Sequence, residues 1–127
     1  MKPETQEWIG KAEGDWKVAS REILADDPVW SVICFLAQQC AEKYLKAFLE
    51  EHHIAFRKTH DLIVLVNSSG GRLPGLDPIR QQLAHLSIFG IATRYPGMEA
   101  DQPAAENAVE IAKMVRAVVR SELGLRG

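Results

Sequence analysis

Apolar residues recur at helical spacing along most of the chain. In the first segment, which opens at Pro3 and Glu4, they mark one face of an α-helix: Trp8, Ala12, Trp16, Ala19 and Ile23. An aspartate followed by Pro28 is typical of a second helix start, with the aspartate as N-cap and the proline in the first turn. This helix is predicted to run from about Pro28 to His53. Its first half is apolar on nearly all sides, so we expect it to be the central helix.

Turn residues separate three further helices. Thr59 is predicted to cap a short third helix that has Asp61 in its first turn. A fourth begins at Asp77-Pro78 and must stop near Tyr95, because the residue before a proline is pushed away from helical geometry. The last is expected from about Ala104 to Leu123. No segment alternates as a strand does, so we predict an all-α, up-and-down bundle of about five helices in one domain, residues 1–127.

Composition and charge narrow the function classes. The 127 residues are 46% hydrophobic and 25% charged, which is ordinary for a globular domain, and the net charge is −2. This balance argues against a surface that grips nucleic acid as a whole, but it allows a local basic groove. Cys34 and Cys40 lie about 9 Å apart along a straight helix, too far for a disulfide, so we expect reduced, buried thiols in a cytoplasmic protein. We expect no signal peptide and no membrane span.

A polar cluster interrupts the apolar central helix. Its members fall mostly four residues apart, so that neighbours can bond along the helix: Gln38, Gln39, Glu42, Lys43 and Lys46. Two interpretations are open. The cluster is either a solvated stripe on a half-exposed helix or a satisfied polar network that lines a groove or a dimer interface. If it is buried, each unpaired member would cost about 1–3 kcal/mol.

The same region resembles a known family. The run FLAQQCAEKYLKAFLEEHHIAFRKTHDL (residues 35–62), followed by Thr93-Arg94-Tyr95-Pro96, is similar to the HEPN domain family, in a subgroup with QQ-x-x-EK, THDL and TRYP motifs. The resemblance implies a helical bundle, usually dimeric and often encoded beside a minimal nucleotidyltransferase as a toxin–antitoxin pair. Many members are RNases that use an arginine followed four to six residues later by a histidine. For other members, the resemblance implies nucleotide binding or a role as an inert interaction module.

Arg80 and His85 match the RNase spacing, but their context differs from that of the toxins. The related toxins carry a tyrosine two residues after the histidine, where Ser87 stands here, and no histidine follows Arg94 in TRYP. Residues five apart on a straight helix also point about 140° away from each other. A metal-independent RNase using Arg80 and His85 is therefore the alternative hypothesis, and the sequence assigns no catalytic residue.

The preferred hypothesis is a binding subunit for a nucleotide or RNA. The candidate ligand-binding residues are His60, Asp61, Arg94, Tyr95, Gln39, Glu42, Lys43, Arg57 and Lys58. His60 suits proton transfer or phosphate contact, and Arg57-Lys58 is the densest basic patch. Structural roles are open for the same residues, as a capping turn at His60-Asp61 and as an ion pair between Arg94 and Glu42.

The expected partners are a second copy of the chain and a nucleotidyltransferase protein, with a nucleotide or RNA as ligand. We expect no cofactor, and no metal, since His52 and His53 lack the partner spacing of a zinc site. The third hypothesis is an inert helical interaction module.

Overall fold

The computed structural model of the chain describes residues 1–90, 96–97 and 99–127, and all regular structure in them is helical. The elements are α1 (Pro3–Glu22), α2 (Trp30–Glu51), α3 (Leu62–Ser68), the 3₁₀ helix η1 (Pro74–Ile79), α4 (Arg80–Ser87), the 3₁₀ helix η2 (Ile88–Gly90) and α5 (Gln102–Glu122). The predicted all-helical fold is confirmed.

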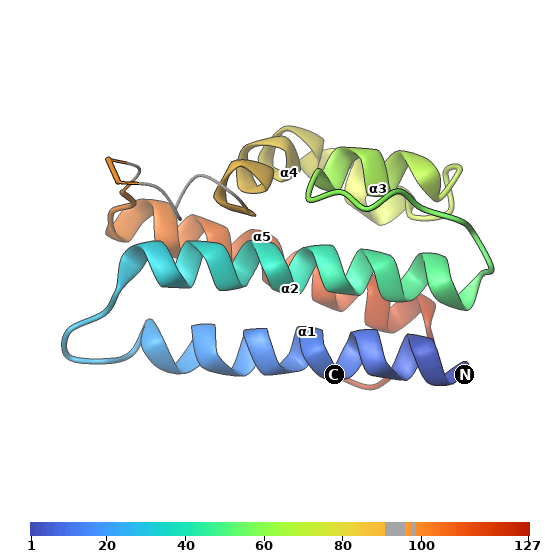
Figure 1. Cartoon of the computed structure of the whole chain (residues 1–127), viewed down its shortest axis with the longest axis horizontal. Helices are drawn as coiled ribbons and strands as arrows, with labels where there is room; N and C mark the ends of the chain where they lie inside the picture. The colour runs from blue at the N-terminus through green and yellow to red at the C-terminus, as the bar shows by residue number, and fades with distance from the viewer. Residues whose placement is uncertain (91–95, 98) are drawn as a thin grey trace.

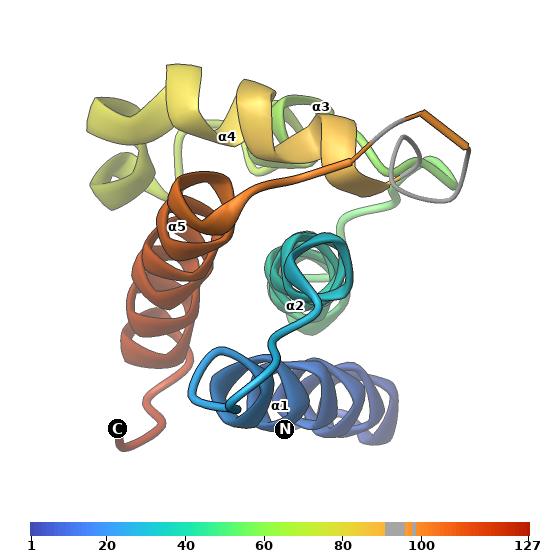
Figure 2. The same ribbon diagram turned by 90° about the vertical axis from the view of Figure 1, so that its left-hand side faces the viewer.

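Helix α2 is the centre of the molecule, as its apolar sequence predicts. Figure 2 shows it with α1 on one side, α5 on another, and the layer of α3 and α4 on a third. Helices α1 and α2 are antiparallel, whereas α5 runs in the same general direction as α2, because α3, η1 and α4 carry the chain back between them (Figure 1). Figure 1 shows α3 lying along α2, whereas Figure 2 shows α4 crossing the direction of α2.

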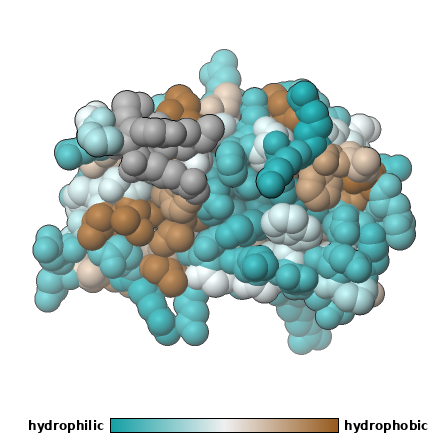
Figure 3. Space-filling view, in the orientation of Figure 1, coloured by the Kyte–Doolittle hydropathy of each residue, from teal (hydrophilic) through white to brown (hydrophobic). Residues whose placement is uncertain are grey.

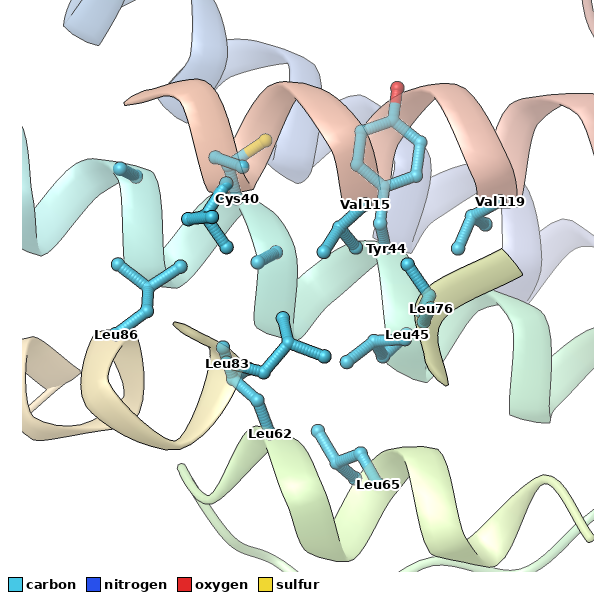
Figure 4. Packing of buried hydrophobic residues seen from close by; sticks show 14 of the residues in the cluster. Cys40, Tyr44, Leu45, Leu62, Leu65, Leu76, Leu83, Leu86, Val115 and Val119 are labelled. Carbon is cyan, nitrogen blue, oxygen red and sulfur yellow. The ribbon is translucent and has the colours of Figure 1, made fainter. Parts of the chain in front are cut away.

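The core gathers around α2. Tyr44, Leu45 and Phe48 are essentially inaccessible to solvent. Leu62 and Leu65 of α3, Leu83 and Leu86 of α4, and Val115 and Val119 of α5 pack toward the same helix (Figure 4). Burial of a side chain of this size contributes about 1.5–3 kcal/mol. The apolar contacts therefore hold the α3–α4 layer to the three long helices.

Two helix starts differ from their predicted positions. Helix α2 begins at Trp30 and not at Pro28, and its N-cap Val29 donates its backbone N–H to Glu22 Oε2 at 3.0 Å. The predicted aspartate cap is therefore wrong: no side chain caps the first turn of α2, and Glu22 holds the N–H of the N-cap residue itself. For α3 the cap is Asp61 itself, whose Oδ1 accepts from the N–H groups of Ile63 and Val64. Thr59 instead accepts the N–H of Asp61.

The other ends differ by a few residues. Helix α2 ends at Glu51, and His53 adopts a left-handed conformation (φ 56°) just beyond it. The turn predicted before the fourth helix is η1, so α4 begins at Arg80. Asp101 caps α5 by accepting the N–H of Ala104, which starts that helix at Gln102. Helix α4 ends at Ser87, so the predicted end near Tyr95 is wrong, and the chain continues as the 3₁₀ helix η2 to Gly90.

An ionic cluster joins the three long helices. Glu13 of α1 accepts two hydrogen bonds from Arg116 of α5, at 2.7 and 2.8 Å, and one from the hydroxyl of Tyr44 of α2, at 2.7 Å. Arg120 donates to the same hydroxyl at 3.1 Å. The hydrogen bonds from Arg116 keep the pKa of Glu13 below its ordinary value, although burial opposes this shift. Burial raises the pKa of Tyr44 to about 12, so its hydroxyl stays a donor.

Gly90 lets η2 approach α2 closely. A Cβ atom at this position would lie 2.8 Å from Cδ of Gln38, closer than nonbonded atoms approach each other. Gln38 is fully buried and its amide is held by hydrogen bonds, so it cannot swing aside cheaply. The missing side chain at residue 90 is therefore a packing requirement of the α2–η2 contact.

We expect Gly90→Ala to lower the free energy of unfolding by about 1–3 kcal/mol, because the added methyl group overpacks the Gln38 amide. Gly14→Ala is the matched control: this glycine is in α1, and a Cβ there would meet nothing within 4 Å. The control should be neutral or stabilise the protein by about 0.5–1 kcal/mol. Urea unfolding of the two variants measures both effects. Equal stabilities would contradict the close approach at Gly90.

We expect Glu13→Gln to lower stability at pH 7 by about 1 kcal/mol, a value reduced by solvent screening because the carboxylate is 33% exposed. Folding lowers the pKa of Glu13, so its contribution is present above the unfolded pKa of about 4.3 and is lost as pH falls through the native pKa. The difference between wild type and variant should therefore shrink below about pH 4. Thermal unfolding across this range tests it, and a difference independent of pH would refute the assignment.

Candidate functional site

The polar cluster of α2 is a buried network centred on Glu42. Oε1 of this carboxylate accepts from Gln38 Nε2 at 3.1 Å and lies 2.8 Å from His60 Nδ1, while Oε2 accepts from Lys46 Nζ at 2.9 Å. Gln38, Glu42 and Lys46 are 0%, 4% and 6% exposed. The interpretation as a satisfied network is confirmed for these three residues, and the solvated stripe is excluded for them.

Glu42 is ionised in this environment. Burial by itself would raise its pKa, but the hydrogen bonds from Lys46, His60 and Gln38 outweigh that effect, and the pKa lies below the ordinary value. An ionised carboxylate can only accept hydrogen bonds. The proton between the two side chains therefore belongs to Nδ1 of His60.

The network fixes the orientation of His60. Its Nδ1 faces Glu42, and its backbone carbonyl accepts a second bond from Gln38 Nε2 at 2.9 Å. The side chain is 45% exposed, in contrast to its buried partner. In the neutral imidazole with the proton on Nδ1, the other ring nitrogen, Nε2, carries a lone pair and accepts hydrogen bonds.

Next to His60 there is an open groove of about 560 Å³. Thr59, His60 and Asp61 form one wall, and Ile63 of α3 with Ala84, Ser87 and Ile88 of α4 and η2 form the rest. This volume falls within the range of about 300–1,000 Å³ that is usual for small-molecule sites. Two of the predicted ligand residues, His60 and Asp61, therefore lie together at a groove large enough for a ligand.

The first backbone amides of α3 are already used inside the protein. Leu62 donates its N–H to Ser87 Oγ at 2.9 Å, and Asp61 Oδ1 accepts from Ile63 and Val64. Ser87 in turn donates its hydroxyl to the Leu83 carbonyl. This end of α3 therefore does not offer free N–H groups to an anion.

The basic pair Arg57-Lys58 lies in the connection between α2 and α3. Both side chains are exposed, and within the described part of the chain no carboxylate pairs with either. The connection is fixed on both sides of them: Phe56 packs edge-on against Trp8 at 6.3 Å between ring centroids, and His60 is bonded to α2. The two cations directly precede Thr59, the first residue of the groove lining.

Gln39 and Lys43 have structural partners. Lys43 Nζ lies 2.6 Å from Asp15 Oδ2 of α1, and Gln39 donates to Gln38 Oε1 at 2.8 Å. The predicted bond between Gln39 and Lys43 is therefore wrong, because each finds a partner elsewhere. Both side chains are only partly exposed and do not line the groove. Arg94 and Tyr95, and the predicted proximity of Arg94 to Glu42, lie outside the described residues.

Arg80 and His85 have separate partners. Arg80 is the first residue of α4, and its Nη2 donates to Asn67 Oδ1 at 2.6 Å. The ring of His85 packs edge-on against Phe89, with centroids 5.8 Å apart. Neither lines the groove. The two side chains of the RNase spacing are thus engaged by different neighbours.

Several groove residues were missed at the sequence level. Ala84, Ser87 and Ile88 come from a helix more than twenty residues beyond His60, and nothing in their own spacing points to a site. For Gln38 and Lys46, by contrast, the i,i+4 spacing to Glu42 predicted that they could bond along the helix, and both bonds are present. The contact of His60 with Glu42 was not predicted, because it joins residues of different segments.

The described residues also show the state of the two cysteines and bear on metal binding and membrane spanning. Cys34 and Cys40 are free and buried, and burial raises the pKa of Cys34 to about 11. Among the described side chains, no three His, Cys, Asp or Glu residues gather where they could hold a metal ion. No helix in this part of the chain has the length and apolar character needed to cross a membrane.

Known proteins share this fold. The crystal structure of TT1696 from Thermus thermophilus superposes with a TM-score of 0.81 at 22% identity, over 95% of this chain and 99% of that one. The structure of ST0689, described as an archaeal HEPN homologue, gives a TM-score of 0.74 at 24% identity over 97% and 99%. At these identities the likeness shows the fold alone. A comparison with curated proteins found no match.

The sequence itself carries the family assignment. The family model described as the HEPN domain matches residues 5–122, nearly the whole chain. The resemblance of the QQ-x-x-EK and THDL segments to this family agrees with that match. The chain therefore belongs to the HEPN domain family.

Proposed function

We propose that this protein is a nucleotide- or RNA-binding HEPN subunit without chemistry of its own, which acts beside a nucleotidyltransferase partner in a toxin–antitoxin-like pair. Membership of the family ties the chain to nucleotide- or RNA-related functions or interactions. The observation that carries the finer proposal is the groove at His60, which combines an oriented imidazole with an adjacent basic pair.

Binding is favoured over catalysis because the Ser87 hydroxyl and the first amides of α3 already have hydrogen-bond partners within the protein. A general base needs a reacting hydroxyl or water and a group that stabilises developing charge. Ser87, the hydroxyl of α4 in the groove, donates to the Leu83 carbonyl, and the first amides of α3 are engaged. The residues that the structure describes thus hold and orient a ligand more readily than they activate one.

The RNase alternative is disfavoured by the surroundings of Arg80 and His85. In a working pair the guanidinium and imidazole act on the same phosphodiester, so both must face one site. Here Arg80 bonds Asn67 and His85 packs on Phe89. Arg94 and Tyr95 remain predicted ligand contacts, along with the Arg57-Lys58 pair.

A second copy of the chain is the proposed protein partner. One side of α2 is not covered by another helix in Figures 1 and 2, and its partly exposed stripe starts with Val32 and Leu36. Nearby, Val18, Leu24 and Val29 are 48%, 84% and 49% exposed, and Figure 3 shows an apolar patch at this end. A two-fold axis through the patch would pair this apolar surface with itself.

The free, buried cysteines also suit a cytoplasmic location.

Titration of labelled nucleotide and single-stranded RNA tests the binding site. We expect the Arg57→Gln/Lys58→Gln double variant, His60→Ala and Arg94→Ala to weaken binding about tenfold or more, whereas His85→Ala leaves it unchanged. Affinity should fall as salt rises, because phosphate contacts release counterions. Loss of binding only in His85→Ala, or RNA cleavage that this variant abolishes, would support the RNase and refute the proposal.

We expect the protein to sediment as a dimer at tens of micromolar, and Val32→Glu to shift it to the 14.2 kDa monomer, since a buried charge would oppose association. Ala117→Glu, at an exposed position of α5, controls for the added negative charge. Light scattering distinguishes the two states. A wild-type protein that is only monomeric would exclude the proposed dimer.

A further inference from the structure

The groove at His60 is rich in hydrogen-bond acceptors. Asp61 uses Oδ1 to cap α3, and its other oxygen, Oδ2, has no partner in the described residues. In the neutral imidazole, with its proton on Nδ1 facing Glu42, His60 adds the lone pair of Nε2. The Ser87 hydroxyl proton and the first amide protons of α3 are already used. The side chains of Asp61 and neutral His60 therefore present acceptors to a ligand on this wall.

Apart from Ser87, the rest of the groove lining is apolar. It is formed by Ile63, Ala84 and Ile88, and Ile88 is 52% exposed. Such a surface suits a flat, largely apolar ring and gives no hydrogen bond to a phosphate. The negative charge of Asp61 would also repel a phosphate held directly against it. The groove therefore fits the base of a nucleotide better than its phosphate.

The basic pair indicates how a bound nucleotide would be oriented relative to the groove. Lys58 is two residues before His60, so their Cα atoms are separated by at most about 7 Å. Arg57 and Lys58 are exposed and directly precede Thr59 of the groove lining, so they are close enough along the chain to meet a phosphate while the base lies against Ile63 and Ile88. The same short segment thus offers cations to one end of a nucleotide and hydrogen-bond acceptors to the other.

We infer that the groove selects nucleobases with an exocyclic amino group, which donates to Asp61 Oδ2 and His60 Nε2, over bases with a carbonyl at that position. This inference rests on the proposed nucleotide-binding function and adds a base preference to it. Cytosine and uracil are the simplest contrast, because the amino group of cytosine is replaced by a carbonyl acceptor in uracil. A carbonyl facing the Asp61 carboxylate would place two acceptors against each other.

The substitution Asp61→Asn separates the two roles of this residue. Asparagine is as good an N-cap as aspartate, so its oxygen continues to accept from Ile63 and Val64. Its amide NH₂ then takes the place of Oδ2 and donates where the native residue accepts. The fold is retained, while the hydrogen-bonding character of the groove wall is reversed.

The experiment measures the affinity of the wild type and Asp61→Asn for CMP and UMP, and for GMP and IMP as a second pair that differs by one amino group. Wild type is expected to bind CMP and GMP about tenfold more tightly than UMP and IMP, the discrimination typical of a good base contact. Asp61→Asn is expected to lose or reverse the preference. Asp77→Asn, which removes the same charge from η1, should retain it.

The outcomes distinguish this inference from the proposed function. If wild type binds all four nucleotides equally, or if Asp61→Asn keeps the wild-type preference, the base contact is refuted while the binding function stands. If wild type binds only RNA and shows no base preference, the base preference is refuted. If wild type binds none of the four nucleotides, both the base preference and the proposed nucleotide binding are refuted. Amide NMR signals of Ile63 and Val64 confirm that the cap persists in the variant.

Discussion

The arrangement of this molecule around its site depends on one buried carboxylate. Glu42 is 4% exposed on the central helix, and an ionised group in that position requires partners for its oxygens. Lys46 and Gln38 are supplied by the same helix, one turn away on each side, but His60 comes from the connection that follows α2. The need to satisfy Glu42 therefore ties a surface segment to the core.

These contacts with α2 determine how the connection between α2 and α3 is held at the surface. Gln38 bonds the His60 carbonyl as well as Glu42, and the absence of a side chain at Gly90 leaves room for its amide. Lys46 continues the same chain of contacts to the ring of Trp8, 5.4 Å from its centroid, and Trp8 packs on Phe56. The connection is thus held on both sides of its basic pair. A flexible segment would lose more conformational entropy on binding a ligand than one already fixed in this way.

The parts of this arrangement that follow from local spacing could be predicted from sequence. The helical pattern located all five α-helices, and the i,i+4 spacing anticipated the two bonds that hold Glu42 within α2. Contacts between distant segments could not be read in this way. Lys43 has Asp15 as its partner because the packing of α1 on α2 brings a carboxylate within 2.6 Å. Likewise, Ala84 and Ile88 are ordinary helix residues until the fold places α4 and η2 beside the groove.

The buried Glu42–Lys46 pair is not explained by stability alone. Replacing a buried ion pair with well-packed apolar residues is often neutral or even stabilising, and the rest of α2 shows that this helix readily accommodates such residues. What an apolar replacement could not do is accept the Nδ1 proton of His60. Without that acceptor the imidazole would lose its fixed orientation and tautomer, and the groove would lose the directed lone pair of Nε2. The polar network is therefore best understood as a device that orients a half-exposed histidine from inside the core.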